Sequence, residues 1–341
     1  MDRCLQKFKR SGEEEKMRWV GLSQIVACLL LLSCLTVTSY AKEEIKLGVV
    51  TKPGSAQNIC AEKFKELLES RSPKYTVTIY HSASLGTETE ILQQVQLGTV
   101  HMAIITSGPF DVFLPEVRVV DYPFLFDSYE QVDAVLDGPP GQEILKRLEK
   151  VGFKGLAFSE NGFRHLTNSK RPVHSVKDVE GLKIRVMESV LHKELWRLLG
   201  ANPTPMGWPI YTELQQGTID GQENPLSVIW TYKLYEVQKY LSLTKHVYSS
   251  HIDIANLKWF NSLPIEDQKL IQEAMIEAAH YQRKWNRENE ATFLKNLKEA
   301  GMIVDENPDI QSFREKAKDI QKLSIFQVKE VQEILPMFLK R

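Results

Sequence analysis

Residues 264–300 read PIEDQKLIQEAMIEAAHYQRKWNRENEATFLKNLKEA, a stretch with no glycine and no proline after Pro264. Proline is a natural first residue of a helix, so the pattern predicts one helix from Pro264 to Ala300. At ~1.5 Å per residue such a helix is about 55 Å long. A lobe of about 120 residues has a radius of gyration near 14 Å, too small to cover this rod. We therefore expect the helix to run across two lobes and tie them together.

The chain before this helix alternates strand-like and helix-like segments. The helix expected first has an apolar stripe from Cys60 to Leu68 at helical spacing. The next begins at the capping box Thr87 to Glu90 and stops at Gly98. Three segments have strand patterns: 46–50, 76–80 and 100–105. This βαβαβ order predicts a largely parallel sheet with helices on both faces.

A second unit repeats the order further along the chain. Residues 183–186 predict a short strand, and the leucines from Leu191 to Leu199 stripe a helix that Gly200 ends. One or two amphipathic helices are expected after Val304. The sequence therefore predicts an α/β fold with two lobes, built from 42–161 plus 250–289 and from 162–249 plus 290–341. Ligands of open parallel sheets bind at the carboxyl ends of the strands, so we expect one cleft between the lobes.

The N-terminus has the pattern of an export signal. Residues 25–37 read IVACLLLLSCLTV, with basic residues before them and small residues up to Ala41 after them. The run is shorter than the roughly 20 apolar residues of a membrane span. We expect residues 1–41 to be a signal peptide cleaved after Ala41, and the protein to be periplasmic. Met17 is an alternative start, and a lipoprotein tether through Cys34 is an alternative to free release.

Composition excludes several classes of function. Without residues 1–41 the chain has 37 Lys+Arg against 40 Asp+Glu, a net charge near −3 that does not attract nucleic acid or anionic membrane. Cys60 is then the one remaining cysteine, so no intramolecular disulfide is expected. The sequence lacks the HExxH, P-loop, GxSxG and dinucleotide glycine motifs. We expect no enzyme, no cofactor and no metal site.

Arg185 is the first candidate for a binding residue. It lies between Ile184 and Val186 in an apolar strand pattern, where an unpaired arginine costs several kcal/mol. No carboxylate partner is evident near it, since Glu188 lies beyond the strand. A bound anion would balance the charge, because the guanidinium matches a carboxylate with two parallel hydrogen bonds. An exposed edge position or a structural ion pair is the alternative.

Seven short blocks follow one another along most of the mature chain: SLG (84–86), DYPFLF (121–126), NGFR (161–164), GLKIR (181–185), NPTPM (202–206), DGQENP (220–225) and YEVQKY (235–240). In this order they resemble the solute-binding proteins of tripartite ATP-independent periplasmic (TRAP) transporters, the DctP family. The resemblance implies the two-lobed periplasmic-binding-protein fold. It also implies that the protein captures a small organic acid and delivers it to a membrane permease driven by an ion gradient.

The resemblance also implies ligand contacts. It assigns a carboxylate clamp to Arg185, a second contact to Arg164 and a polar contact to Asn224. Trp208 falls on the aromatic wall of the family's pocket, with ordinary packing between the lobes as its alternative. The loop after Trp208 lacks the family's glutamate, and its effect on the pocket wall is left open. Sialic-acid-binding members have a glutamate where Thr106 stands, which disfavours a bulky amino sugar here.

Two further candidates come from the first lobe. Glu88, just past the SLG turn, would accept hydrogen bonds from ligand hydroxyls, or is simply an acidic residue favoured by the helix dipole. Asn58 lies near the start of the first helix. The ligand stays open among a sugar acid, a C4-dicarboxylate and a hydroxy or keto acid, with a polyhydroxylated monocarboxylate preferred. We expect a monomer, and the alternative function is sensing, with the closed protein presented to a receptor kinase.

Overall fold

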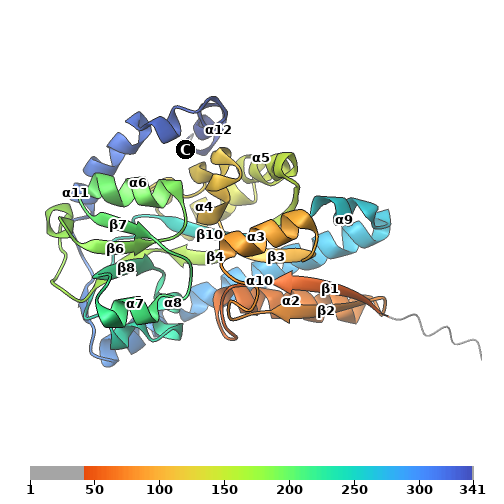
Figure 1. Ribbon diagram of the computed structural model, residues 1–341, viewed down its shortest axis with the longest axis horizontal. Helices are drawn as coiled ribbons and strands as arrows, with labels where there is room; N and C mark the ends of the chain where they lie inside the picture. The colour runs from red at the N-terminus through yellow and green to blue at the C-terminus, as the bar shows by residue number, and fades with distance from the viewer. Residues whose placement is uncertain (1–41, 340–341) are drawn as a thin grey trace, which may run out of the picture. The chain divides into compact units, whose positions relative to one another are not determined.

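The computed structural model describes residues 42–339, which contain two β-sheets and the helices that cover them (Figure 1). We call the part built on the five-stranded sheet lobe I and the part built on the six-stranded sheet lobe II. The predicted signal peptide, including Met17 and Cys34, lies outside the described residues. The predicted lobe boundaries stay a prediction.

The sheet of lobe I has the strand order β2-β1-β3-β10-β4. Its strands are β1 (Glu43–Gly48), β2 (Tyr75–Tyr80), β3 (Met102–Thr106), β4 (Phe153–Phe163) and β10 (Tyr248–Asn256). Strand β1 pairs in parallel with β2 and β3, as the βαβαβ pattern predicts. Strand β10 pairs antiparallel with both β3 and β4, so it is the one reversed strand of this sheet.

The helices of lobe I begin and end where the sequence signals place them. Helix α2 (Ala56–Arg71) buries the predicted stripe from Cys60 to Leu68. Helix α3 (Glu88–Leu97) begins at the capping box, in which the N–H of Thr87 donates to Oε2 of Glu90 over 2.7 Å. It ends at Gly98, whose φ of +82° is readily adopted only by glycine. The remaining helices are α4 (Tyr129–Leu136), α5 (Pro139–Arg147) and α9 (Leu257–Ser262).

The sheet of lobe II has the strand order β11-β9-β5-β8-β6-β7. Its strands are β5 (His165–Asn168), β6 (Lys183–Val186), β7 (Asn202–Pro205), β8 (Gly221–Asn224), β9 (Tyr240–Ser242) and β11 (Ile303–Asp305). Strand β5 is antiparallel to both of its neighbours, and the other pairings are parallel. The helices are α6 (Val190–Leu199), α7 (Tyr211–Gln216), α8 (Leu226–Thr231) and α11 (Ile310–Ala317).

Two short backbone segments connect a strand of one sheet directly to a strand of the other. Arg164 separates β4 from β5, and residues 243–247 separate β9 from β10. The two crossings are joined, since the N–H of Arg164 donates to the carbonyl of Val247 over 2.8 Å. In each sheet the reversed strand, β5 or β10, directly follows a crossing. Arg164 therefore lies at the junction of the lobes.

Helix α10 (Ile265–Glu299) is the long helix that the glycine-free stretch predicts. It packs along α2 and β4 and then reaches α8 of lobe II (Figure 1). Ile271 and Met275 join the core of lobe I, while Phe293 and Leu297 join a core of lobe II. The helix thus spans both lobes, as expected.

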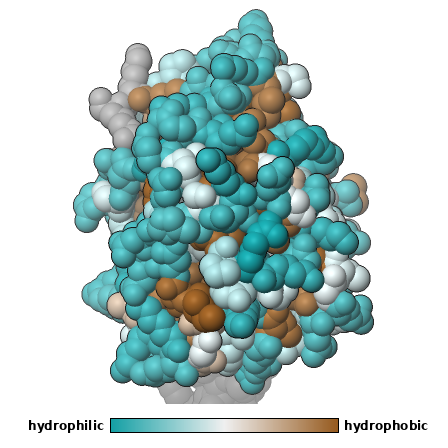
Figure 2. All heavy atoms as spheres, turned by 90° about the vertical axis from the view of Figure 1, so that its left-hand side faces the viewer, coloured by the Kyte–Doolittle hydropathy of each residue, from teal (hydrophilic) through white to brown (hydrophobic). Residues whose placement is uncertain are grey.

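The chain returns to lobe I after α11. The last helix, α12 (Lys329–Leu339), packs against the short 3-10 segment Pro115–Val119 that follows β3. On the face of the molecule at the left of Figure 1, hydrophilic residues dominate and apolar side chains surface in small separate patches (Figure 2).

Candidate functional site

A cavity lies between the two sheets, at the carboxyl ends of strands from both lobes. It is lined from lobe I by Val50, Thr51, Gln57, Glu88, Thr106, Asn161 and His251, and from lobe II by Arg185, Met187, Trp208, Asn224 and Val228. Its position follows from the topology, because the carboxyl ends of parallel strands leave their loops free to hold a ligand. Five of the seven predicted site residues line this cavity.

The two lobes touch each other beside the cavity. The backbone N–H of Lys52 donates to the hydroxyl of Tyr232 over 2.8 Å. The hydroxyl of Thr89 donates to Oε2 of Glu188 over 3.2 Å. The enclosed volume is about 40 Å³, whereas a dry cavity that holds benzene measures about 150 Å³. The lobes therefore lie in contact in this structure, and a ligand larger than the cavity requires them to move apart.

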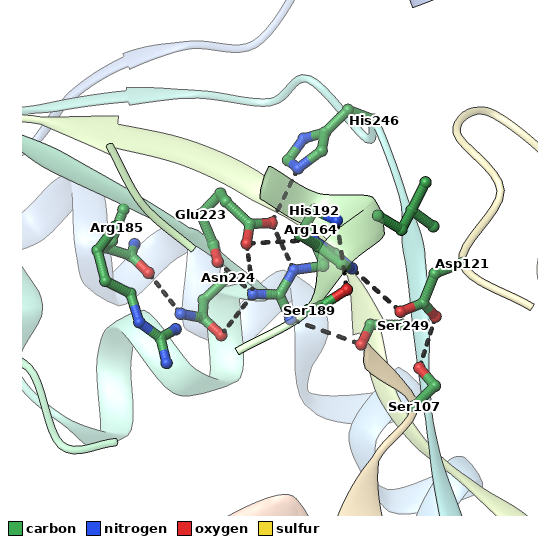
Figure 3. Close-up of polar contacts among 12 residues, drawn as sticks. Ser107, Asp121, Arg164, Arg185, Ser189, His192, Glu223, Asn224, His246 and Ser249 are labelled. Atoms are coloured by element: carbon green, nitrogen blue, oxygen red, sulfur yellow. Dashed lines mark hydrogen bonds and ion pairs between the residues drawn. The ribbon is translucent and has the colours of Figure 1, made fainter. Parts of the chain in front are cut away.

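Arg185 projects from β6 towards this cavity, and its residue is only 4 % exposed. Its Nε and Nη2 donate to the carbonyl oxygen of Met206 over 2.8 and 2.5 Å. Among the described residues no carboxylate forms an ion pair with it, and Nη1 makes no hydrogen bond. Figure 3 shows its guanidinium next to the side chain of Asn224. Part of the fork is thus free to bind a molecule in the cavity.

The charge of Arg185 persists despite its burial. Burial lowers the pKa of its guanidinium to about 10, and the nearby charge of Arg164 acts in the same direction. At neutral pH the group remains protonated. The face of Trp208 lies 5.6 Å from its Cζ, close enough for a cation–π contact. The cavity therefore holds a buried cation that no carboxylate of the described chain pairs with directly, although the carboxylate of Glu88 lines the same cavity.

Asn224 and Trp208 form the rest of the lobe II wall. The amide nitrogen of Asn224 donates to Oε1 of Gln222 over 2.5 Å, and its amide oxygen accepts from Nη2 of Arg164 over 3.2 Å. These bonds fix which end of the amide faces which neighbour. The ring of Trp208 packs edge-on against Tyr232, with centroids 4.6 Å apart. Packing between side chains and contact with the cavity thus coexist at Trp208.

Glu88 is the acidic group of the lobe I wall. Its Oε1 accepts from the side chain of Gln57 and from both the N–H and the hydroxyl of Thr106, over 2.7 to 2.8 Å. Its Oε2 has no hydrogen bond among the described residues. One oxygen is therefore fixed by the protein, and the other is available to a hydroxyl in the cavity.

Arg164 lies behind Asn224 and not on the cavity wall. It is fully buried, and its Nε and Nη2 bind the carboxylate of Glu223 over 2.5 and 3.0 Å. Its charge is thus balanced inside the protein (Figure 3). The predicted contact between Arg164 and the ligand stays a prediction.

Two histidines complete the buried network around Glu223. Nε2 of His246 lies 2.9 Å from Oε2 of Glu223, and Nε2 of His192 lies 3.0 Å from Oδ2 of Asp121. Burial works against a charged His192, but the carboxylates of Glu223 and Asp121 raise its pKa to about 9. Burial would raise the pKa of Glu223, yet Arg164 and His192 lower it well below its usual range. In this network the positive charges of Arg164 and His192 are balanced by the carboxylates of Glu223 and Asp121.

Asn58 does not line the cavity, and its neighbour Gln57 does. Asn58 is 2 % exposed, and its Oδ1 accepts from the N–H of Gly54 over 3.3 Å. Successive residues of a helix point about 100° apart, so a shift of one position decides which side chain meets the cavity. Any contact of Asn58 with a ligand stays a prediction.

Four polar cavity residues escaped the sequence analysis: Thr51, Gln57, Asn161 and His251. Asn161 belongs to the NGFR block, so the block itself pointed to the right segment. His251 lies in a strand whose pairing with β3 and β4 cannot be read from local sequence. Among residues 42–339 no cluster of His, Cys, Asp and Glu is arranged to hold a metal ion. In the same range no helix has both the length and the apolar character needed to cross a bilayer.

Comparison with known proteins identifies close relatives of the chain. Residues 47–327 match the family described as bacterial extracellular solute-binding protein, family 7, DctP. A solute-binding protein of Verminephrobacter eiseniae is 42 % identical over 282 residues, covering 81 % of this chain and 83 % of the relative. The 2,3-diketo-L-gulonate-binding periplasmic protein of Escherichia coli is 35 % identical over 300 residues, covering 87 % and 90 %.

Solved structures with the same fold belong to the same kind of protein. The crystal structure of a TRAP periplasmic solute-binding protein from Polaromonas sp. JS666, bound to D-erythronate, superposes with a TM-score of 0.83 at 38 % identity. The match covers 88 % of this chain and 99 % of that one.

Proposed function

Because this chain belongs to family 7 of the bacterial extracellular solute-binding proteins, which serve TRAP transporters, we propose that its ligand is a polyhydroxylated monocarboxylate. The function itself is the capture of a small organic acid between two lobes for delivery to a TRAP-type permease. The family match supports transport over the sensing role that the sequence also allowed. Proteins of this family are binding proteins of transport systems and not enzymes.

The free guanidinium of Arg185 carries the proposal. A buried cation without a carboxylate partner is costly unless an anion accompanies it. A ligand carboxylate would accept from the open side of the fork while Met206 holds the other side. Closing the lobes over the carboxylate excludes water and strengthens this contact, because a Coulomb interaction grows as the effective dielectric falls.

Glu88 supports hydroxyls on the rest of the ligand. Its unbonded Oε2 would accept from a hydroxyl but would repel a second carboxylate, which disfavours a C4-dicarboxylate. The names of two relatives agree, since the E. coli protein is named for binding 2,3-diketo-L-gulonate and the Polaromonas protein holds D-erythronate. Thr106, which donates to Glu88, sets the position of this acceptor. Trp208 and Asn224 would contact the carbon chain and a ligand oxygen.

The mechanism is capture by closure. A ligand shifts the open–closed balance only by binding the closed state more tightly, and here the residues that would bind it come from both lobes. The closed protein then docks on its permease. We propose that it works as a periplasmic monomer, exported by its N-terminal signal, without catalysing a reaction on the acid it carries.

Replacing Arg185 with lysine tests the proposal. Arg185→Lys keeps the positive charge but loses the fork, so affinity for D-erythronate or a related sugar acid is expected to weaken at least tenfold. Isothermal titration calorimetry measures it. The matched control is Arg197→Lys, an exposed arginine on α6 of the same lobe, which should bind as the wild type does. An Arg185→Lys protein with undiminished affinity would remove Arg185 from the site.

A further inference from the structure

Two polar residues on the lobe I side of the cavity have no role in the scheme above. His251 lies in the middle of β10, directly opposite Thr106 on β3. Residues paired across a sheet project to the same face, and Thr106 itself lines the cavity. Asn161 comes from the neighbouring strand β4. The two side chains therefore approach the cavity from adjacent strands.

A β-bulge places Asn161 there. Ser249 of β10 pairs with Gly162, but the next residue, Ser250, pairs with Glu160, so Asn161 is the extra residue without a partner. Bulges redirect a side chain and are frequent beside functional sites. This one turns a residue of a buried strand towards the space between the lobes.

The long helix α10 holds the bulge in place. Gln282 accepts from the N–H of Glu160 over 2.7 Å and donates to its carbonyl over 2.8 Å. Asn286 donates to the carbonyl of Asn161 over 3.2 Å and to Oε1 of Glu160 over 2.9 Å. The backbone of the bulge is thus satisfied by α10, which leaves the side chain of Asn161 free.

Both side chains lack partners although they are buried. His251 is 2 % exposed and Asn161 is 5 % exposed. Nδ1 of His251 is enclosed and unbonded. The Asn161 amide lines the cavity and forms no hydrogen bond with any described residue. A buried polar group without a partner costs about 1–3 kcal/mol. Binding a molecule in the cavity would remove that cost.

The chemistry of the pair favours an uncharged group. Burial, reinforced by the charge of Arg164, lowers the pKa of His251 to about 3, so the imidazole is neutral at physiological pH. Glu88 and Arg185 are the charged groups that share the cavity with it. A neutral imidazole offers one donor and one acceptor, and an amide offers both as well. A hydroxyl, which also donates and accepts, is the matching ligand group.

We infer that Asn161 and His251 form a second contact point that binds a ligand hydroxyl and so separates hydroxylated carboxylates from their deoxy analogues. This inference rests on the proposed sugar-acid ligand and adds the residues that recognise its hydroxyl group. Arg185 binds the carboxylate of the ligand. Asn161 and His251 bind a hydroxyl on one of its carbon atoms, so a ligand without that hydroxyl binds more weakly.

A set of four acids tests the inference by calorimetry: D-erythronate and its 2-deoxy, 3-deoxy and 4-deoxy analogues. In the wild type, at least one deoxy acid should bind tenfold or more weakly than erythronate. In His251→Phe and in Asn161→Ala, the affinity for erythronate should fall to that for the deoxy acid. The affinities of each variant for these two acids should then differ by less than threefold. His251→Gln keeps a donor and an acceptor, so it should retain part of the discrimination.

The controls separate the possible failures. Met187→Leu changes an apolar wall residue and should affect all four acids equally. If His251→Phe and Asn161→Ala weaken all four acids by one common factor, or none of them, the inference is wrong while the proposed function stands. If the wild type binds none of the four, and no hexuronate or aldonate stabilises it in a thermal-shift screen, both are rejected. Unfolding temperatures of the ligand-free variants confirm that they fold.

Discussion

Arg185 and Arg164 are both buried, are close enough for their charges to interact, and differ in one respect. Arg164 has its counter-charge inside the protein, where Glu223 binds it through two nitrogens. Arg185 has the carbonyl of Met206, the face of Trp208 and a cavity, but no carboxylate partner. The difference shows how a fold distinguishes a structural cation from a functional one. In the network behind the site, Glu223 balances the charge of Arg164. In the cavity, the charge of Arg185 has no paired carboxylate until a ligand binds.

The largest expected effect comes from breaking the network. Glu223→Gln leaves Arg164 and His192 without their shared carboxylate in a fully buried position. Removing one partner of a buried pair costs about 3–5 kcal/mol, and we expect a loss of that size in the free energy of unfolding. Urea denaturation followed by circular dichroism measures it.

The matched variant is Arg185→Met. It removes a buried charge that no protein carboxylate balances, so the unfolding free energy of the ligand-free protein should stay the same or rise. It should also lose the stabilisation of about 2.7 kcal/mol that a ligand at 100 times its dissociation constant gives the wild type. Equal stability losses in Glu223→Gln and Arg185→Met would mean that the two arginines play the same structural role.

Two buried histidines, one in the network and one in the cavity, should affect stability in opposite pH ranges. His192 in the network has its pKa raised to about 9, above the ordinary value of about 6.5 that applies when unfolded. The stability that protonated His192 contributes to the fold is therefore fully present below about pH 6.5 and is lost as the pH rises towards 9. His251 in the cavity has its pKa lowered to about 3. The unfolded chain gains that proton first, so stability is lost as the pH falls from about 6.5 towards 3.

Chemical denaturation across the pH range measures both effects. The stability advantage of the wild type over His192→Gln should shrink between pH 6.5 and 9, by up to about 1.4 kcal/mol per pH unit. The wild type should lose stability relative to His251→Gln between pH 6.5 and 4. Parallel pH profiles for the wild type and both variants would contradict the assigned charge states.

The smallest expected effect concerns the contact between the lobes. Tyr232→Phe removes the hydroxyl that accepts from the N–H of Lys52 across the cleft but keeps the ring that packs on Trp208. One hydrogen bond contributes about 0.5–1.5 kcal/mol, so affinity should fall by about two- to tenfold. Stopped-flow measurements should place the change in ligand dissociation. An unaltered dissociation rate would show that this contact does not hold the lobes closed.

Local sequence patterns predicted the parts of the fold that local forces determine. The glycine-free stretch predicted α10, because helix formation depends on neighbouring residues. The capping box predicted the start of α3 for the same reason. Arg185 was predicted as a site residue because a charge inside an apolar strand is conspicuous in one dimension. The resemblance to a known family supplied two further lobe II residues of the cavity wall, Asn224 and Trp208.

The rest of the site depends on pairings between distant segments. Glu223 binds Arg164 from 59 positions away, so no residue near Arg164 in the chain indicates that it lies behind the wall. The bulge at Asn161 exists only in relation to β10, whose register is set by tertiary packing. The choice between Gln57 and Asn58 depends on a helix rotation of one residue. None of these features leaves a periodic signal.

The place of β10 in its sheet has a consequence for biosynthesis. This strand lies between β3 and β4, but the ribosome makes it only after about three quarters of the chain. A nascent chain that ends before residue 248 therefore has β3 and β4 without the neighbour they share, and lobe I cannot finish its sheet. Lobe I therefore completes its sheet only late in synthesis, after most of the chain has been made.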